Sequence, residues 1–194
     1  HARTNNYHVA FAAIPLDLYY ANKEAVRIFR TAHDRLSLLI HGNNHLANEL
    51  GRDYDHGQRI SLISHALARV GKFEKRTGIP ISRVMAAPHG TCTESMLGAM
   101  SECGIEGGSI SFGSLFKANR GREWITPMGL DPATIVSGLP VFNRIHLSMD
   151  HTNEIFLAAY LNQPIIPNGH HGDLKDHYEI LRAQVDVING LTDV

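Results

Sequence analysis

Two histidines four residues apart, His41 and His45, come directly behind the apolar run Leu36–Ile40 and limit the architectures open to this chain. The run has the length of a buried strand, so both imidazoles lie where that strand leaves the core. Side chains at positions i and i+4 of one helical turn face the same way. Two neutral imidazoles placed in this manner can share one divalent metal ion. The spacing alone is weak support, because the chain contains 13 histidines.

Apolar, strand-like runs alternate with longer helix-patterned stretches along the whole chain, which is typical of β/α units around a mostly parallel sheet. Strands are predicted at His8–Leu16, Leu36–His41, Arg83–Ala87, Ile105–Phe112, Val141–Leu147 and Pro164–Asn168. Helices are predicted at Asn22–His33, Gln58–Thr77, Thr91–Cys103, Asn153–Leu161 and Leu174–Asn189. The stretch Phe116–Gly138 is rich in Gly and Pro, shows little periodicity and is predicted to be a long irregular excursion.

Length and composition fit one domain, since 194 residues with 43% hydrophobic content can bury a full core. The 18 basic and 19 acidic residues give a net charge of -1. They form no run of like charge, which gives little support to a nucleic-acid or membrane-surface partner. The longest apolar runs, such as Val9–Ile14, are far shorter than the roughly 20 residues that cross a bilayer. We therefore expect a single domain over residues 1–194, with no nucleic-acid partner and no membrane span.

Histidines follow three of the predicted strands. His41 and His45 follow one strand, the segment Pro88-His89-Gly90 follows the next, and His170 and His171 follow the last. In parallel β/α architectures the carboxyl ends of the strands share one face, and active sites form on that face. Three convergent histidine segments are less expected by chance than one pair, so the sequence predicts a metal site there.

The order of these features resembles the polysaccharide deacetylases of the NodB-homology type, carbohydrate esterase family 4, over nearly the whole chain. That family has a His-x-x-x-His metal pair after a strand, and His41–His45 has this layout. In the family, a helix that ends in Thr-Gly-x-Pro leads to an Arg-Pro-Pro-Tyr-Gly loop. In this chain the helix ends in Thr-Gly-Ile-Pro at residues 77–80, and the corresponding loop is Ala-Ala-Pro-His-Gly at residues 86–90. The family's last strand ends in a catalytic His, which Pro164–Asn168 with His170 and His171 resembles.

The resemblance implies an α/β fold with mostly parallel strands, an incomplete or distorted (β/α) barrel of the (β/α)7 type. It implies that His41 and His45 bind a divalent metal, with Zn²⁺ the expected ion, and that His170 or His171 is the general acid. Pro88, His89 and Gly90 would contact the substrate, and a backbone N–H near His89 would stabilise the oxyanion. The implied reaction is removal of N-acetyl groups from an amino-sugar-containing polysaccharide, in the cell envelope or outside the cell.

The chain departs from that family at two places. The family's third metal ligand and catalytic base are two Asp residues on its first strand, and nothing before residue 41 matches them. We expect the domain to be truncated at its N-terminus, with that strand in an upstream segment of the same protein. Ala86 stands in place of the family's loop Arg and His89 in place of its Tyr, with Arg83 three residues away.

Further side chains are weaker candidates. Trp124 lies in the irregular excursion, where its indole could stack on a sugar ring or anchor the loop. His146 is at a strand end, and Asp150 and Asp173 lie on strand-end loops, where turn or helix-cap roles are more common than catalysis. Three alternatives to the deacetylase stay open: another metal-dependent hydrolase on the same barrel, a non-catalytic carbohydrate-binding pseudoenzyme, and a structural domain without metal.

Overall fold

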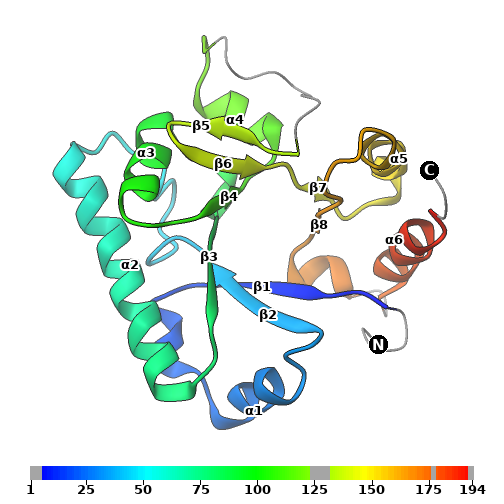
Figure 1. The fold of residues 1–194 in the computed structure, drawn as a ribbon, viewed down its shortest axis with the longest axis horizontal. Coiled ribbons are helices and arrows are strands. Elements are labelled where there is room, and N and C mark those ends of the chain that lie inside the picture. Colours follow the sequence, from blue (N-terminus) through cyan, green and yellow to red (C-terminus); the bar gives the residue numbers. More distant parts are fainter. Residues whose placement is uncertain (1–5, 123–131, 176–177, 192–194) are drawn as a thin grey trace.

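The computed structural model describes residues 6–122, 132–175 and 178–191. They form an α/β fold around a six-stranded, mostly parallel sheet (Figure 1). Its strand order is β1-β2-β3-β4-β6-β5, and only the β5–β6 pair is antiparallel. The strands are β1 (Val9–Ala13), β2 (Leu36–Ile40), β3 (Ile81–Ala86), β4 (Gly107–Ser109), β5 (Thr134–Val136) and β6 (Leu139–Phe142). The predicted α/β class with mostly parallel strands is confirmed.

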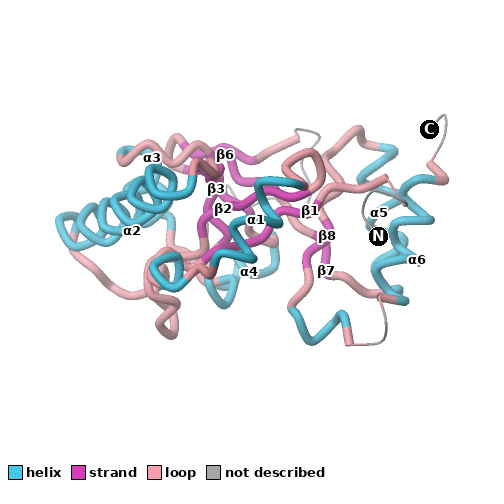
Figure 2. The backbone as a smooth tube through the Cα atoms, turned by 90° about the horizontal axis from the view of Figure 1, so that it is seen from below, coloured by secondary structure: helices cyan, strands magenta, loops and turns pink. Residues whose placement is uncertain are grey.

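Four helices accompany this sheet: α1 (Lys23–Thr31), α2 (His56–Thr77), α3 (Glu94–Glu102) and α4 (Phe112–Ala118). The longest, α2, begins at a capping box made by Asp55 and Gln58 and ends at Gly78, whose φ of 70° suits a left-handed helix end. Its apolar face buries Ile63, Val70 and Phe73 in the main core. Figure 2 shows α2 and α3 side by side next to the strands. Within the described residues, no helix is both long and apolar enough to cross a membrane.

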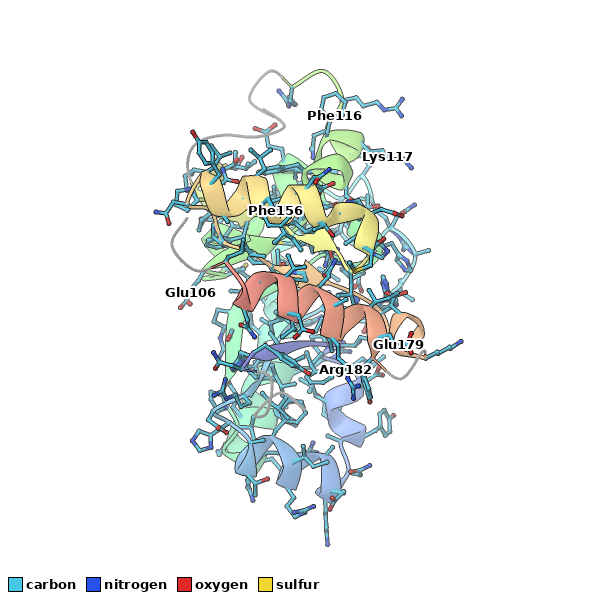
Figure 3. All side chains as sticks on the ribbon, turned by 90° about the vertical axis from the view of Figure 1, so that its right-hand side faces the viewer. Glu106, Phe116, Lys117, Phe156, Glu179 and Arg182 are labelled. Atoms are coloured by element: carbon cyan, nitrogen blue, oxygen red, sulfur yellow. The ribbon has the colours of Figure 1, made fainter. Side chains whose placement is uncertain are left out.

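A second, smaller unit follows the sheet. Strands β7 (Ile145–His146) and β8 (Pro167–Asn168) form a separate parallel pair. Helices α5 (Thr152–Tyr160) and α6 (Glu179–Asn189) lie side by side in this part of the molecule (Figure 3). A small apolar core holds the unit together: Ile145, Ile155 and Ala158 are buried, with Ile165, Val187, Ile188 and Leu191 packed against them.

Several predicted elements differ from the structure. The predicted strand Val141–Leu147 is divided into β6 and β7, which belong to different sheets. The two sheets do not form a closed barrel. The predicted strand Ile105–Phe112 is only three residues long, because its last residue opens α4. Both α4 and the β5–β6 hairpin overlap the predicted excursion Phe116–Gly138, so its described ends are a helix and a strand, and Gly138, with a φ of 83°, lies in the hairpin turn.

Candidate functional site

Three histidine side chains meet beyond the carboxyl ends of β2 and β3. His41 directly follows β2, and His89 lies in the 3-10 turn η2 (Pro88–Gly90) that follows β3. The ring centroid of His45 is 4.8 Å from that of His41 and 4.8 Å from that of His89. Parallel pairing of β2 with β3 places the two strand ends next to each other. We call His41, His45 and His89 the imidazole cluster.

The His41–His45 pair forms through a loop and not on a helical turn as the spacing had suggested. Gly42 has a φ of 62° and His45 a φ of 59°, so the chain turns through left-handed conformations between the two rings. A Cβ atom on Gly42 would lie 2.3 Å from Glu49 Oε2 and 2.6 Å from Pro88 Cγ. The loop therefore depends on glycine at position 42 for both conformation and space.

A buried carboxylate holds this loop from the inside. Glu49 is 1% exposed, and its two oxygens accept hydrogen bonds from the backbone N–H groups of Asn43, Asn44 and His45 at 2.8, 2.8 and 3.2 Å. Arg69 on α2 holds the loop from the other side by donating to the side-chain oxygens of Asn43 and Asn44, each at 2.6 Å. Because Glu49 is occupied by the backbone, its role is to position His45.

The surroundings of His41 favour a neutral ring with a free Nε2. Its Nδ1 donates to the Ala86 carbonyl at 2.9 Å, which leaves the Nε2 lone pair available to a metal ion. Burial lowers the pKa of the His41 imidazole, against the opposing effect of its bond to Ala86. The neighbouring His45, Arg144 and His89 lower that pKa further. A neutral imidazole is the form that binds metal.

Arg144 adds a positive charge near the cluster. It lies in the connection from β6 to β7 and is half-buried. Its Nε is buried without a hydrogen-bond partner among the described residues, and burial lowers the pKa of the guanidinium. A buried guanidinium nitrogen without a partner is costly, so this group is suited to an anionic partner.

Backbone strain is concentrated at the same place. His89 has φ 55° and ψ 14°, the left-handed region that non-glycine residues rarely adopt, and His45 shares that region. Such conformations cost of order 1–3 kcal/mol each and cluster at functional sites.

Two hollows flank the imidazole cluster. One, of about 390 Å³, is lined by Asn48, His89, Gly90, Thr91, Ser114, Lys117 and Ala118. The other is an open groove of about 490 Å³ between the loop that carries Asn43 and Asn44 and the first turns of α2. The first hollow is the one that includes a ring of the cluster, so a ligand bound there lies beside the histidines.

The other site residues expected from the sequence lie elsewhere or are not described. Pro88 and Gly90 are buried on either side of His89. The His170 side chain is 83% exposed, with its Nδ1 4.0 Å from Asp173 Oδ2, and no ring contact joins it to the cluster among the described residues. His171 opens the 3-10 helix η4 (His171–Leu174), but its side chain is outside what is described. Trp124 also lies outside the described residues.

The weaker candidates form a separate group on the small unit. His146 and His151 have ring centroids 6.0 Å apart, and His151 Nδ1 is 2.6 Å from Glu154 Oε1. Ser148 caps the short 3-10 turn that contains Asp150: its Oγ accepts from the Asp150 backbone N–H at 3.2 Å and donates to Asp150 Oδ2 at 3.5 Å. Asp173 accepts from the His170 backbone N–H at 2.7 Å. These carboxylates therefore have local turn-forming roles.

The cluster fits two ligands of a metal site but not a complete one. In the part of the chain that is described, no group of three or more His, Cys, Asp and Glu side chains is arranged to hold a metal ion. His41 and His45 are adjacent, and His41 has a free Nε2 oriented by a backbone carbonyl, as zinc-binding histidines have. Glu49, the carboxylate of the same loop, is already bonded to three backbone N–H groups and so is not a free third ligand.

Neither the comparison with family models nor the comparison with curated proteins finds a match for this chain. The function must therefore be argued from the site itself.

Proposed function

We propose that this protein is a metal-dependent hydrolase that removes N-acetyl groups from an amino-sugar-containing polysaccharide. The observation that carries the proposal is the His41–His45 pair, with ring centroids 4.8 Å apart beyond the end of a parallel strand. His41 and His45 would hold the ion, Zn²⁺ being the expected one. When bound, such an ion lowers the pKa of a water ligand and polarises a carbonyl.

The remaining roles fall to groups around the cluster. Pro88, His89 and Gly90 form the wall against which the acetamide would lie, with a backbone N–H near His89 facing the developing oxyanion. His170 or His171, on the loop after β8, would protonate the leaving amine. Both lie on the small unit, so this role requires the β8 loop to approach the cluster when substrate is bound.

The third ligand and the general base would come from outside the described residues. Strand β1 pairs with β2 and with no other described strand, and Phe11 at its centre is 48% exposed. An exposed edge of this kind can accept a further strand. We propose that an upstream segment adds a parallel strand there, completes the (β/α)7-type barrel and brings carboxylates to the cluster. Arg144 would pair with one of them, in place of the arginine that Ala86 replaces.

Metal content tests the central claim. Purified chain is analysed for bound metal beside His41→Ala, with His65→Ala, an exposed histidine on α2, as the matched control. With Zn²⁺ added, we expect the parent and the control to bind the ion and His41→Ala to lose it. Retention of metal by His41→Ala would overturn the assignment. If the chain binds metal weakly, a form extended at its N-terminus should bind it more tightly.

Release of acetate separates the enzyme from the alternative of a carbohydrate-binding pseudoenzyme. That alternative is favoured by one observation: among the described residues no third metal-ligating side chain completes the imidazole cluster, and the Glu49 carboxylate is bonded to backbone N–H groups. N-acetylated oligosaccharides should release acetate with the metal-loaded protein, and one of His170→Ala and His171→Ala should lose turnover while keeping its metal. Binding of oligosaccharide and metal with no acetate released would favour the pseudoenzyme.

A further inference from the structure

The hollow of about 390 Å³ beside His89 is built from three separate segments. Asn48 comes from the loop after β2, Thr91 from the turn after β3, and Lys117 from α4. Its volume is in the range of small-molecule sites. His89 belongs both to this hollow and to the imidazole cluster, so the hollow is continuous with the site of the proposed reaction. Figure 3 shows Lys117 on α4, at the margin of the molecule.

The lining of the hollow offers hydrogen-bond donors and a positive charge. Lys117 is exposed and makes no ion pair among the described residues. Ser114 Oγ accepts a hydrogen bond from the Ser111 hydroxyl at 2.9 Å, so its own proton is free to point into the hollow. Asn48 and Thr91 add an amide and a hydroxyl group, and no Asp or Glu lines the hollow. This set of groups matches an acceptor-rich anion.

Gly90, which lines the hollow, leaves no room for a side chain. A Cβ atom at this position would lie 2.6 Å from Ser114 Oγ, and the φ of 70° also favours glycine. The backbone of the turn therefore comes close to Ser114 on α4, and both His89 and Lys117 line the same cavity.

We infer that this hollow binds the carboxylate of an acidic sugar next to the N-acetylated residue, with Lys117 as its charged partner and Ser114 as a hydroxyl donor. The inference rests on the proposed function for the glycan substrate and adds its class, an N-acetylated glycan that contains uronic acid. One ammonium group balances one carboxylate. A neutral glycan would leave that charge unused.

The test compares two probes that have the same sugar sequence and differ in whether their carboxyl groups are charged or methylated. A tetrasaccharide of alternating glucuronate and N-acetylglucosamine and its methyl ester are titrated into the protein by calorimetry at low salt. We expect the acid to bind about fivefold more tightly than the ester, which corresponds to about 1 kcal/mol for a solvent-exposed ion pair. Lys117→Met, which keeps an unbranched side chain of nearly the same length and removes its charge, should remove this preference. Lys72→Met, at an exposed position on α2, should keep it.

Each outcome decides a different question. Equal affinity for the two probes, no binding of either, or a preference that survives Lys117→Met overturns the inference. A preference that depends on Lys117 supports it, and weakening by added salt adds to that support. Acetate release is measured separately. If acetate is released from both probes but their affinities are equal, the proposed function stands and this inference is removed. If the acid is preferred through Lys117 but no acetate is released, binding of the acidic glycan stands and the deacetylase activity is contradicted.

Discussion

His89 carries an imidazole in a backbone conformation that suits glycine, with φ 55°. Relief of this strain should stabilise the fold, so His89→Gly is expected to raise the free energy of unfolding by about 1 kcal/mol. The same change at His65, inside α2, should lower it by about 1 kcal/mol, because glycine is unfavourable in a helix interior. Urea unfolding of the two variants measures both effects. A destabilised His89→Gly would mean that the imidazole itself stabilises the turn.

His41 should make stability depend on pH. Burial holds the pKa of its folded-state imidazole below 6.5, while the unfolded chain keeps a value near 6.5. Below about pH 6.5 the unfolded chain therefore binds more protons, and the free energy of unfolding falls as the pH drops through the lowered folded-state pKa. Metal-free protein should lose more stability between pH 7.5 and pH 5.5 than His41→Gln does. His65→Gln is the control and should behave like the parent.

The loop from Gly42 to Glu49 shows how one element is held by a single buried side chain. Glu49→Gln keeps the shape but leaves at least one of three backbone N–H groups without an acceptor, which should cost about 2 kcal/mol of stability. The change should also weaken metal binding, since His45 is placed by this loop. Glu102→Gln, at a side chain 59% exposed, should change stability by less than about 0.5 kcal/mol. Thermal unfolding and metal titration of both variants check this, and equal effects would count against the positioning role.

The molecule as a whole contains two apolar cores of unequal size. The sheet core includes Ile40, Val70 and Met85, whereas the unit with β7, β8, α5 and α6 depends on a cluster around Ile155. Amide hydrogen exchange should therefore be faster in residues 145–191 than in β2 and β3. Ile155 is fully buried, so Ile155→Ala should lower the free energy of opening of this unit, measured by exchange, by about 2–4 kcal/mol. Exchange in the sheet core should stay unchanged. Uniform loss of protection would show that the molecule unfolds as one unit.

The alternation of apolar runs and helical periods was enough to predict the α/β class, the parallel strands and most helices, because burial of alternating elements leaves few other arrangements. The His41–His45 motif was likewise visible as a pair. Its geometry was not, since a loop around Gly42 and not a helical turn brings the rings together. Glu49, Arg144 and Lys117 have no spacing motif that would reveal them. Strand pairing and the packing of α4 place Arg144 and Lys117 near the cluster, because contacts between residues distant in sequence depend on how the elements are arranged in space. Glu49 is only four residues from His45, and its inward position depends on how their shared loop folds.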